Sequence, residues 1–399
     1  MKKFLVYFVL GVVIAGVISP KYVSQPQGLE IIDHKLRDML FINRGPIETT
    51  GNVLIVDIDE RSLKELGQFP WKRSDVARMA QNLADAGAGA IGFDIMFPEP
   101  DRSSPHRVIE ELEISQLVPD EKKVNFDEIL AKTVAESQTV LGYAFDFDDA
   151  EVYRGKPAPE IQVSLNANNR GQREFLFEPS GVITNIPTIQ QGSRTSGFFN
   201  VTPDSDGVVR SAPLAIAYNG QIYPSLALES LRIASSVEQV GVNYDELGVR
   251  SIDLDGYEVP TDVHGRIAIN YRGPSFTFDY VSAVDIIRGD FNPDDIAGKI
   301  ILIGTSAVGL LDMRNTPFDA IYPGVEIHAN IIDNVIAGDF LSTPAVADGI
   351  NIFMILLLAI VVTMAIGYSS ALILPFIIAG VAFLFLYVAN YMLFTEGTI

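Results

Sequence analysis

Apolar positions cluster at the two ends of the chain and alternate with polar ones in between. Residues 4–19 form one apolar run without a charged side chain, and residues 350–394 form two more, separated by the polar segment 367–370. About 20 consecutive apolar residues are enough for a helix to cross a bilayer. The C-terminal region therefore predicts two membrane helices. The N-terminal run is shorter and follows Lys2 and Lys3, so it is either a retained anchor or a cleaved secretory signal.

These boundaries predict three domains. They are an N-terminal transmembrane anchor or signal over residues 1–22, a globular domain over residues 23–348 and two transmembrane helices over residues 349–399. Because positive residues concentrate on the cytoplasmic side of a membrane, Lys2 and Lys3 place the N-terminus in the cytoplasm. The globular domain is then extracytoplasmic, and the predicted location is the inner (plasma) membrane.

The globular region begins with an alternation of strand and helix. Residues 52–59 predict a buried strand, because a short run rich in Val and Ile is typical of parallel strands covered on both faces. Residues 75–86 have helical spacing behind Ser74 as an N-cap, and residues 90–97 predict a second strand. This order predicts a right-handed crossover that joins a parallel pair of strands.

Later segments continue the alternation, with more turns in the middle. Strands are predicted at residues 139–147 and 299–304, hairpin strands at 195–200, 207–218 and 221–223, two further hairpins within 248–271, and helices at 127–137, 225–234, 281–289 and 325–337. An exposed irregular insertion is predicted at 98–120 and a loop or mobile hairpin at 148–171. The predicted fold class is α/β, with a mostly parallel central sheet flanked by helices, a hairpin-rich middle section and transmembrane α-helices.

Composition narrows the classes of protein and partner. The chain has a formal net charge of −21 and no cysteine. The missing thiols exclude disulfides, zinc–thiolate sites and thiol nucleophiles. An acidic surface repels nucleic acid and can attract cations, although the same charge also serves solubility alone. We therefore expect no nucleic-acid partner.

Three acidic residues lie near the ends of predicted strands. Asp57 and Asp59 share one face at the end of the first strand, and Asp94 lies in the second. Ligands of open parallel sheets bind beyond the carboxyl ends of the strands. Without cysteine, such a carboxylate cluster suits a hard cation, so a Ca²⁺ or Mg²⁺ ion held by these residues is a candidate cofactor, although the sequence leaves the cofactor unknown. The alternative is that they cap helices, bind loop amides or pair with Arg73.

Other segments carry weaker signals. Trp71, the only tryptophan, lies between Pro70 and Arg73, where it either stacks on a ligand or anchors a lid to the core. Gly304–Gly309 follows a strand as phosphate-binding loops do, but it has no lysine. Asp204–Gly207 resembles the start of a calcium loop without its later acids. Both loops predict turns rather than ligand sites.

The histidines indicate no catalytic centre. His34, His106, His264 and His328 are not at metal-ligand spacing, and the chain has no Gly-x-Ser-x-Gly motif. Glu326 and His328 open the helix before the membrane segments, where they either cap and pack or bind a ligand. No catalytic residue is predicted, and we expect that the chain is not an enzyme.

Seven motifs, in order, resemble those of a known bacterial family. They are Val56–Asp59, Gly67–Arg73, Gly92–Phe97, Asp204–Arg210, Ile303–Leu310, Asp312 with Thr316–Pro317, and Tyr322–Asn330. Over about residues 29–340 the chain resembles the second type of the CHASE family, the extracellular sensory domains of cyclases and histidine kinases. That family usually has three helices after the sensor and then a cytoplasmic output domain. Here two apolar segments follow, so the resemblance implies an output beyond this chain or in a partner.

The leading hypothesis is a membrane sensor that binds an unknown small molecule or cation and relays a conformational change. The candidate ligand-binding residues are Asp57, Asp59, Trp71, Arg73, Asp94 and Asp312, and the candidate relay residues are Glu326, His328 and Asn330. The expected partners are the membrane, the ligand and further copies of the chain. Two alternatives stay open: a surface-displayed protein that self-assembles, and a metal-dependent hydrolase built on Asp57, Asp59 and Asp94.

Overall fold

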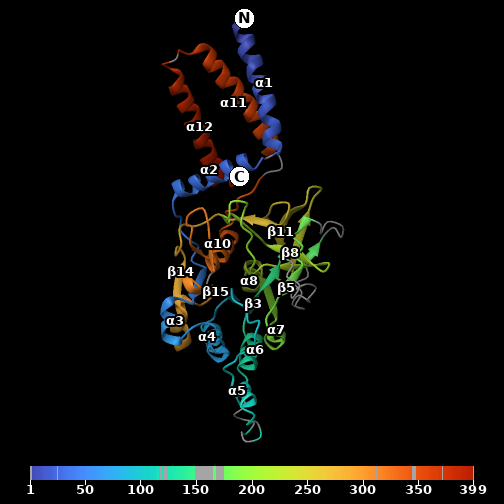
Figure 1. Ribbon diagram of the computed structural model, residues 1–399, viewed down its shortest axis with the longest axis vertical. Coiled ribbons are helices and arrows are strands. Elements are labelled where there is room, and N and C mark those ends of the chain that lie inside the picture. Colours follow the sequence, from blue (N-terminus) through green and yellow to red (C-terminus); the bar gives the residue numbers. More distant parts are fainter. Residues whose placement is uncertain are drawn as a thin grey trace. The chain divides into compact units, whose positions relative to one another are not determined.

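The computed structural model describes residues 2–24, 26–114, 116, 119, 124–148, 165–167, 175–310, 312–343, 347–370 and 372–398. The chain divides into two compact units, one formed by residues 1–45 with 341–399 and the other by residues 46–340. The globular unit begins 23 residues after and ends 8 residues before the domain expected over residues 23–348, whose bounds stay a prediction. Figure 1 labels some of the elements of both units.

The first unit contains four long helices, α1 (Lys2–Ser24), α2 (Gln27–Arg44), α11 (Ala347–Tyr368) and α12 (Leu374–Phe394). By length and composition, three segments of the described part of the chain could cross a membrane: Lys2–Ser24, Gly349–Tyr368 and Leu374–Phe394. The N-terminal helix is longer than its uncharged run, because Pro20 to Ser24 continue it.

Helices α1 and α11 pack alongside each other (Figure 1). A side chain at Gly11 would be blocked, because its Cβ would lie 2.8 Å from the Cα of Ile360. Small residues of this kind allow membrane helices to approach closely.

The centre of the globular unit is a mostly parallel sheet. Its strands lie in the order β14 (Asp279–Ser282), β1 (Val53–Asp57), β15 (Ile300–Gly304), β2 (Ala90–Phe93), β3 (Thr139–Asp146) and β5 (Gly181–Ile183), and β6 (Thr195–Phe198) also pairs with β3. Only the β3–β5 pairing within this sheet is antiparallel. The predicted fold class is therefore confirmed.

Two details of the predicted sheet are wrong. Strands β1 and β2 are parallel but not neighbours, because β15, which comes about two hundred residues later, inserts between them. The segment at Thr195–Phe198 is not a hairpin strand but a parallel strand beside β3. Both differences arise from long-range pairing that the local pattern does not encode.

Helices cover both faces of the sheet. On one face Leu54 and Ile303 join a core cluster with Val76 and Met79 of α4 (Arg73–Asp85). The remaining helices of the unit are α3 (Glu60–Leu66), α5 (Pro105–Glu111), α6 (Phe126–Glu136), α7 (Pro187–Gly192), α8 (Leu226–Ala234), α9 (Ala283–Arg288) and α10 (Gly324–Ala337). On the other face a Cβ at Gly304 would lie 2.5 Å from Val325 Cβ of α10, so this helix packs directly on the strand end.

Small sheets make up the hairpin-rich section. They pair β12 (Tyr257–Pro260), β11 (Val249–Leu254), β10 (Val240–Tyr244) and β4 (Leu165–Ala167); β7 (Ser211–Pro213) with β13 (Arg266–Ala268); β8 (Ala215–Tyr218) with β9 (Gln221–Pro224); and β16 (Met313–Arg314) with β17 (Tyr322–Pro323).

The predicted turns of this section are confirmed in part. Asn219 and Gly220 join β8 to β9 with positive φ angles of 49° and 74°, as the tight hairpin turn requires. The hairpin predicted at His264–Gly265 is wrong, since β13 pairs with β7 instead. The insertion predicted at 98–120 contains α5. The loop predicted at 148–171 lies outside the described residues except for Asp148 and β4.

Candidate functional site

A cavity of about 300 Å³ lies at the carboxyl ends of the central strands. It is lined by Ile58, Phe69, Asp94, Ile95, Met96, Phe199, Val201, Thr305, Leu310, Asp312, Arg314, Gly324 and His328. Ile58 follows β1, Asp94 follows β2, Phe199 follows β6 and Thr305 follows β15. This edge is where open parallel sheets bind their ligands.

The row of residues at this edge explains how α10 comes close to the cavity. Asp57 pairs with Gly304 in the sheet register, and Phe93 pairs with Ile303, so Asp94 lies level with Gly304. The missing side chain at Gly304 allows α10 to approach between the two acids. His328 of α10 thereby reaches the cavity from the opposite side.

Asp94 and His328 form a buried pair without good hydrogen bonds. His328 Nε2 lies 3.6 Å from Asp94 Oδ1, and the side chains are 3% and 5% exposed. Among the described residues, Asp94 Oδ2 has no hydrogen-bond partner, whereas the backbone of Phe199 interacts with His328 and opposes the lowering of its pKa. Burial raises the pKa of Asp94 well above its usual value, with the Asp312 charge adding to the shift. Burial lowers the pKa of His328 to about 4. His328 is therefore neutral near pH 7, and burial disfavours the charged form of Asp94.

Asp312 brings a second carboxyl group to the cavity. Arg314 Nη2 donates to Asp312 Oδ1 at 3.1 Å, and the Arg314 side chain is 42% exposed. Burial raises the pKa of Asp312, although Arg314 opposes the shift. The Asp312 carbonyl also accepts a bond from Gly324 N at 3.0 Å, which ties this loop to the start of α10.

Asp57 and Asp59 lie nearby with their hydrogen bonds already made. Asp57 accepts from Ser306 N at 2.8 Å and from Ser306 Oγ at 2.5 Å. Asp59 caps α3 by accepting from Ser62 N at 2.7 Å, and it also accepts from Ser282 Oγ at 2.9 Å. Among the described residues, these two acids and Asp94 do not bring three ligand atoms within 4.8 Å of one another. The geometry gives no support to the predicted metal site, which stays a prediction.

Trp71 and Arg73 fix the loop behind the cavity rather than lining it. Trp71 is buried, its Nε1 donates to the Gly67 carbonyl at 2.8 Å, and its ring packs edge-on against Phe69. The Arg73 guanidinium lies 4.4 Å from the centre of the Phe97 ring and donates to the Trp71 carbonyl. These contacts favour the lid interpretation, and within this loop Phe69, rather than Trp71 or Arg73, lines the cavity.

Helix α10 is buried on nearly every side, which differs from the amphipathic helix expected at 325–337. Glu326 accepts hydrogen bonds from the backbone N–H groups of Phe276 and Thr277, both at 2.9 Å, and from Tyr280 Oη at 3.0 Å. Burial raises the pKa of Glu326, and these donors oppose the shift. Glu326 therefore anchors the loop before β14.

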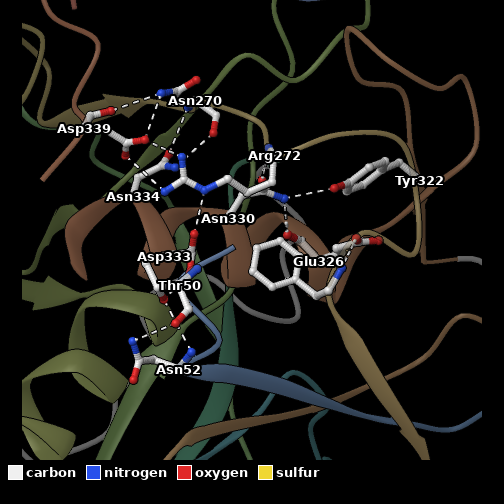
Figure 2. Close-up of polar contacts among 11 residues, drawn as sticks. Thr50, Asn52, Asn270, Arg272, Tyr322, Glu326, Asn330, Asp333, Asn334 and Asp339 are labelled. Carbon is white, nitrogen blue, oxygen red and sulfur yellow. Dashed lines mark hydrogen bonds and ion pairs between the residues drawn. The ribbon is translucent and has the colours of Figure 1, made fainter. Parts of the chain in front are cut away.

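Figure 2 shows the polar contacts that continue along the same side of α10. Asn330 accepts from Arg272 N at 2.8 Å, and Asn334 exchanges two bonds of 2.9 Å with the Asn270 backbone. Arg272 Nε donates to Asp333 Oδ2 at 2.5 Å, and its guanidinium also binds Asp339. We call Asn270, Arg272, Glu326, Asn330, Asp333, Asn334 and Asp339 the α10 polar network.

Comparison with known proteins identifies the family. The CHASE2 domain matches residues 9–366. The chain belongs to the CHASE2 family. No curated protein and no solved structure matches it.

The family assignment confirms the resemblance found in the motifs. A CHASE2 domain is a sensory domain rather than a catalytic one, and together with three candidate membrane helices it fits a membrane sensor. The matched range includes every residue of the cavity and of the α10 polar network.

The two loops with incomplete ligand motifs serve the CHASE2 fold as turns. After Gly304, Thr305 Oγ1 donates to the Ile58 carbonyl at 3.0 Å, and Ser306 holds Asp57. In the other loop, Arg210 pairs with Asp204 and Asp206, both at 2.9 Å.

Several residues of the CHASE2 cavity and network escaped sequence reasoning. Arg314, Phe199 and Val201 line the cavity but lie in segments without a distinctive pattern. Arg272 is 2% exposed, a rare location for arginine, and its partner Asp333 is fully buried. The available signal was the acidic Asp333 within the predicted helix, because a buried charge requires a partner from elsewhere.

Proposed function

We propose that this chain is an extracytoplasmic sensor whose ligand binds the cavity at the carboxyl ends of β1, β2, β6 and β15. Binding shifts α10, and the shift passes to α11 and an output module or partner. The observation that carries this proposal is the position of His328. It lines the cavity, and it belongs to the helix that precedes the second candidate membrane span by a short link at residues 338–346.

Two features of α10 support a relay. On its His328 side the helix lines the cavity, where Asp94 Oδ2 has no hydrogen-bond partner among the described residues. Its other side is held by the α10 polar network. A ligand that prefers one arrangement of α10 about 100-fold shifts the equilibrium by about 2.7 kcal/mol. That free energy is enough to reverse a modest bias between two packings.

The side on which the CHASE2 domain lies is part of the proposal. Lys2 and Lys3 begin the first candidate span, and the positive-inside rule then places residues 46–340 outside the cytoplasm. Fusions of an extracytoplasmic reporter enzyme after residue 340 test this location. Activity of a matched cytoplasmic reporter at the same position would contradict it.

The relay is tested by distance measurements between spin labels. Because the chain has no cysteine, Ile336→Cys on α10 and Asp279→Cys on β14 allow clean double labelling of the full chain in nanodiscs. Both side chains are exposed, at 39% for Ile336 and 71% for Asp279. The panel contains small organic amines, alcohols and carboxylic acids, with Ca²⁺ and Mg²⁺. We expect a binder to change the distance by about 1–2 Å, the size of helix shifts in switching proteins.

The control is Val201→Phe, which fills part of the cavity. The variant should keep its fold and lose the distance change. A binder that leaves the distance unchanged, or a response that survives Val201→Phe, would contradict the relay from this cavity.

A further inference from the structure

We propose that the cavity binds a small organic ammonium ion, that is, a protonated amine on a compact apolar body. This inference rests on the proposed function for the role of the cavity as the sensory site. It adds the chemical class of the ligand, which the family assignment leaves open.

The charges around the cavity favour a cation. Two carboxyl groups, Asp94 and Asp312, face it, and the guanidinium that lines it, Arg314, is already paired with Asp312 at 3.1 Å. His328 is neutral because burial lowers its pKa to about 4. An anionic ligand would meet two acids and one occupied guanidinium, and the chain's net charge of −21 would repel it further.

Asp94 supplies a specific acceptor. Its side chain is 5% exposed, and among the described residues its Oδ2 has no hydrogen-bond partner. Buried polar atoms in proteins are nearly always paired, so an unpaired oxygen at a cavity wall indicates a missing donor. An ammonium group has three donors and a positive charge, which satisfies this oxygen and removes the repulsion between Asp94 and Asp312.

A bare divalent cation fits less well. Ca²⁺ takes six to eight oxygen ligands, and Mg²⁺ requires an octahedral set. Within the described part of the chain, Asp94, Asp312 and His328 do not place three ligand atoms within 4.8 Å of one another. The donor set is therefore too sparse to replace the hydration shell of such an ion.

The remaining walls determine the body of the ligand. They are largely apolar, through Ile58, Phe69, Ile95, Met96, Phe199 and Val201. Aromatic faces attract cations, and apolar walls favour a hydrocarbon body. At about 300 Å³ the cavity lies at the small end of ligand pockets, so the ligand is a small amine.

The test compares probes with the same skeleton and different head groups. The full chain in detergent is titrated with isopentylamine, isopentanol and isovalerate, and with phenethylamine, phenethyl alcohol and phenylacetate. Binding is followed by the fluorescence of Trp71, which packs against the cavity residue Phe69, and by calorimetry. We expect at least one amine to bind about tenfold or more tightly than its alcohol, with the acid weakest.

Two variants locate the effect. Asp94→Asn should lower amine affinity about tenfold and leave the alcohol within about twofold. Asp295→Asn removes an exposed carboxylate outside the cavity and should change neither affinity. A calorimetric melt shows whether each variant is folded before titration.

The outcomes separate this inference from the proposed function. Equal or tighter binding of the alcohols or acids, binding of Ca²⁺ or Mg²⁺ that requires Asp94, or no amine binding would overturn the ammonium assignment. The sensor proposal would survive if another bound probe changes the spin-label distance. Conversely, amine binding that depends on Asp94 without any distance change would support the ligand class and overturn the relay.

Discussion

The buried polar side chains on the two sides of α10 differ in their hydrogen bonding. On one side, Glu326, Asn330, Asp333 and Asn334 each bind at least one partner from another segment of the globular unit. On the other side, two positions beyond Glu326 and about 200° around the helix, His328 faces Asp94 without a hydrogen bond. The first arrangement fixes one packing, and the second keeps acceptors available for a ligand.

This difference shows how one helix can be both anchored and responsive. A satisfied buried network favours a unique arrangement, whereas each unsatisfied buried group costs free energy until something pairs with it. The cost at Asp94 is what a ligand can recover by supplying a donor. The free energy for a shift of α10 would then come from ligand binding in the cavity. The α10 polar network would fix the position from which the helix moves.

The largest expected effect comes from removing an ion pair of the α10 polar network. Arg272→Met leaves the fully buried Asp333 without its cation. We expect the free energy of unfolding of the globular unit to fall by about 3–5 kcal/mol, as for other buried pairs that lose one partner. Trp71 fluorescence of the full chain in detergent reports the transition, because Trp71 is the only tryptophan.

Two further variants sharpen that result. Arg250→Met removes an exposed pair with Glu258, at 3.8 Å, and should change stability by less than about 0.5 kcal/mol. Adding Asp333→Leu to Arg272→Met should recover much of the loss, because it removes the unpaired charge. No recovery would show that Arg272 acts mainly through Asp339 or by packing.

The second effect tests the close approach of α10 to the sheet. Gly304→Ala places a methyl group 2.5 Å from Val325 Cβ, which forces the helix away from the strand end. We expect a loss of about 1–3 kcal/mol, the usual cost of overpacking. Val325→Ala in the same chain should offset part of it, and simple additivity in urea unfolding would contradict direct contact.

The third effect is a gain in stability, expected at the cavity, where Asp94 Oδ2 has no hydrogen-bond partner among the described residues. Asp94→Asn should stabilise the globular unit near pH 7, on the order of 1 kcal/mol, because it removes the penalty of burying an ionisable carboxyl group without a partner. The folded pKa of Asp94 is raised, so its contribution to stability is fully present below about pH 3.8 and is lost as pH rises through the folded pKa.

The difference between variant and wild type should therefore grow from pH 4 to pH 8. Burial lowers the pKa of His328 to about 4, so its titration destabilises both proteins as the pH falls from about 6.5 toward 4. Because this effect is present in both proteins, it largely cancels in the stability difference between them. The melting midpoints of both proteins between pH 4 and pH 8 measure this stability difference. A variant less stable than wild type at pH 8 would show that Asp94 has a partner in the folded state.

The smallest effect is expected at the mouth of the cavity. Arg314→Gln removes a pair with Asp312 in which the arginine side chain is 42% exposed. Such pairs contribute little, so stability should change by less than about 0.5 kcal/mol. A larger loss in the melt would place Arg314 among the structural residues rather than at an open entrance.

Local sequence predicted much of the fold. Runs rich in Val and Ile at β1 and β15, the helix that became α10, and the Asn219–Gly220 turn are determined by residues within a few positions of one another. The seven motifs, taken in order, also indicated the CHASE2 family. Asp94 was a candidate as an acid at a strand end, Asp312 as part of a family motif and His328 as part of the helix before the membrane segments, and all three line the cavity.

The chain alone therefore determined the apolar ends, the acidic globular region, the strand and helix types, and the family. Only the tertiary structure decided that β15 lies between β1 and β2, that Arg272 pairs with Asp333, and that Asp94 meets His328. Propensity and periodicity are properties of neighbours along the chain. Strand order and buried pairing depend on contacts between residues far apart in the sequence. Arg272 and Asp333 are 61 residues apart, and Asp94 and His328 are farther apart still. Only packing in three dimensions selects such contacts.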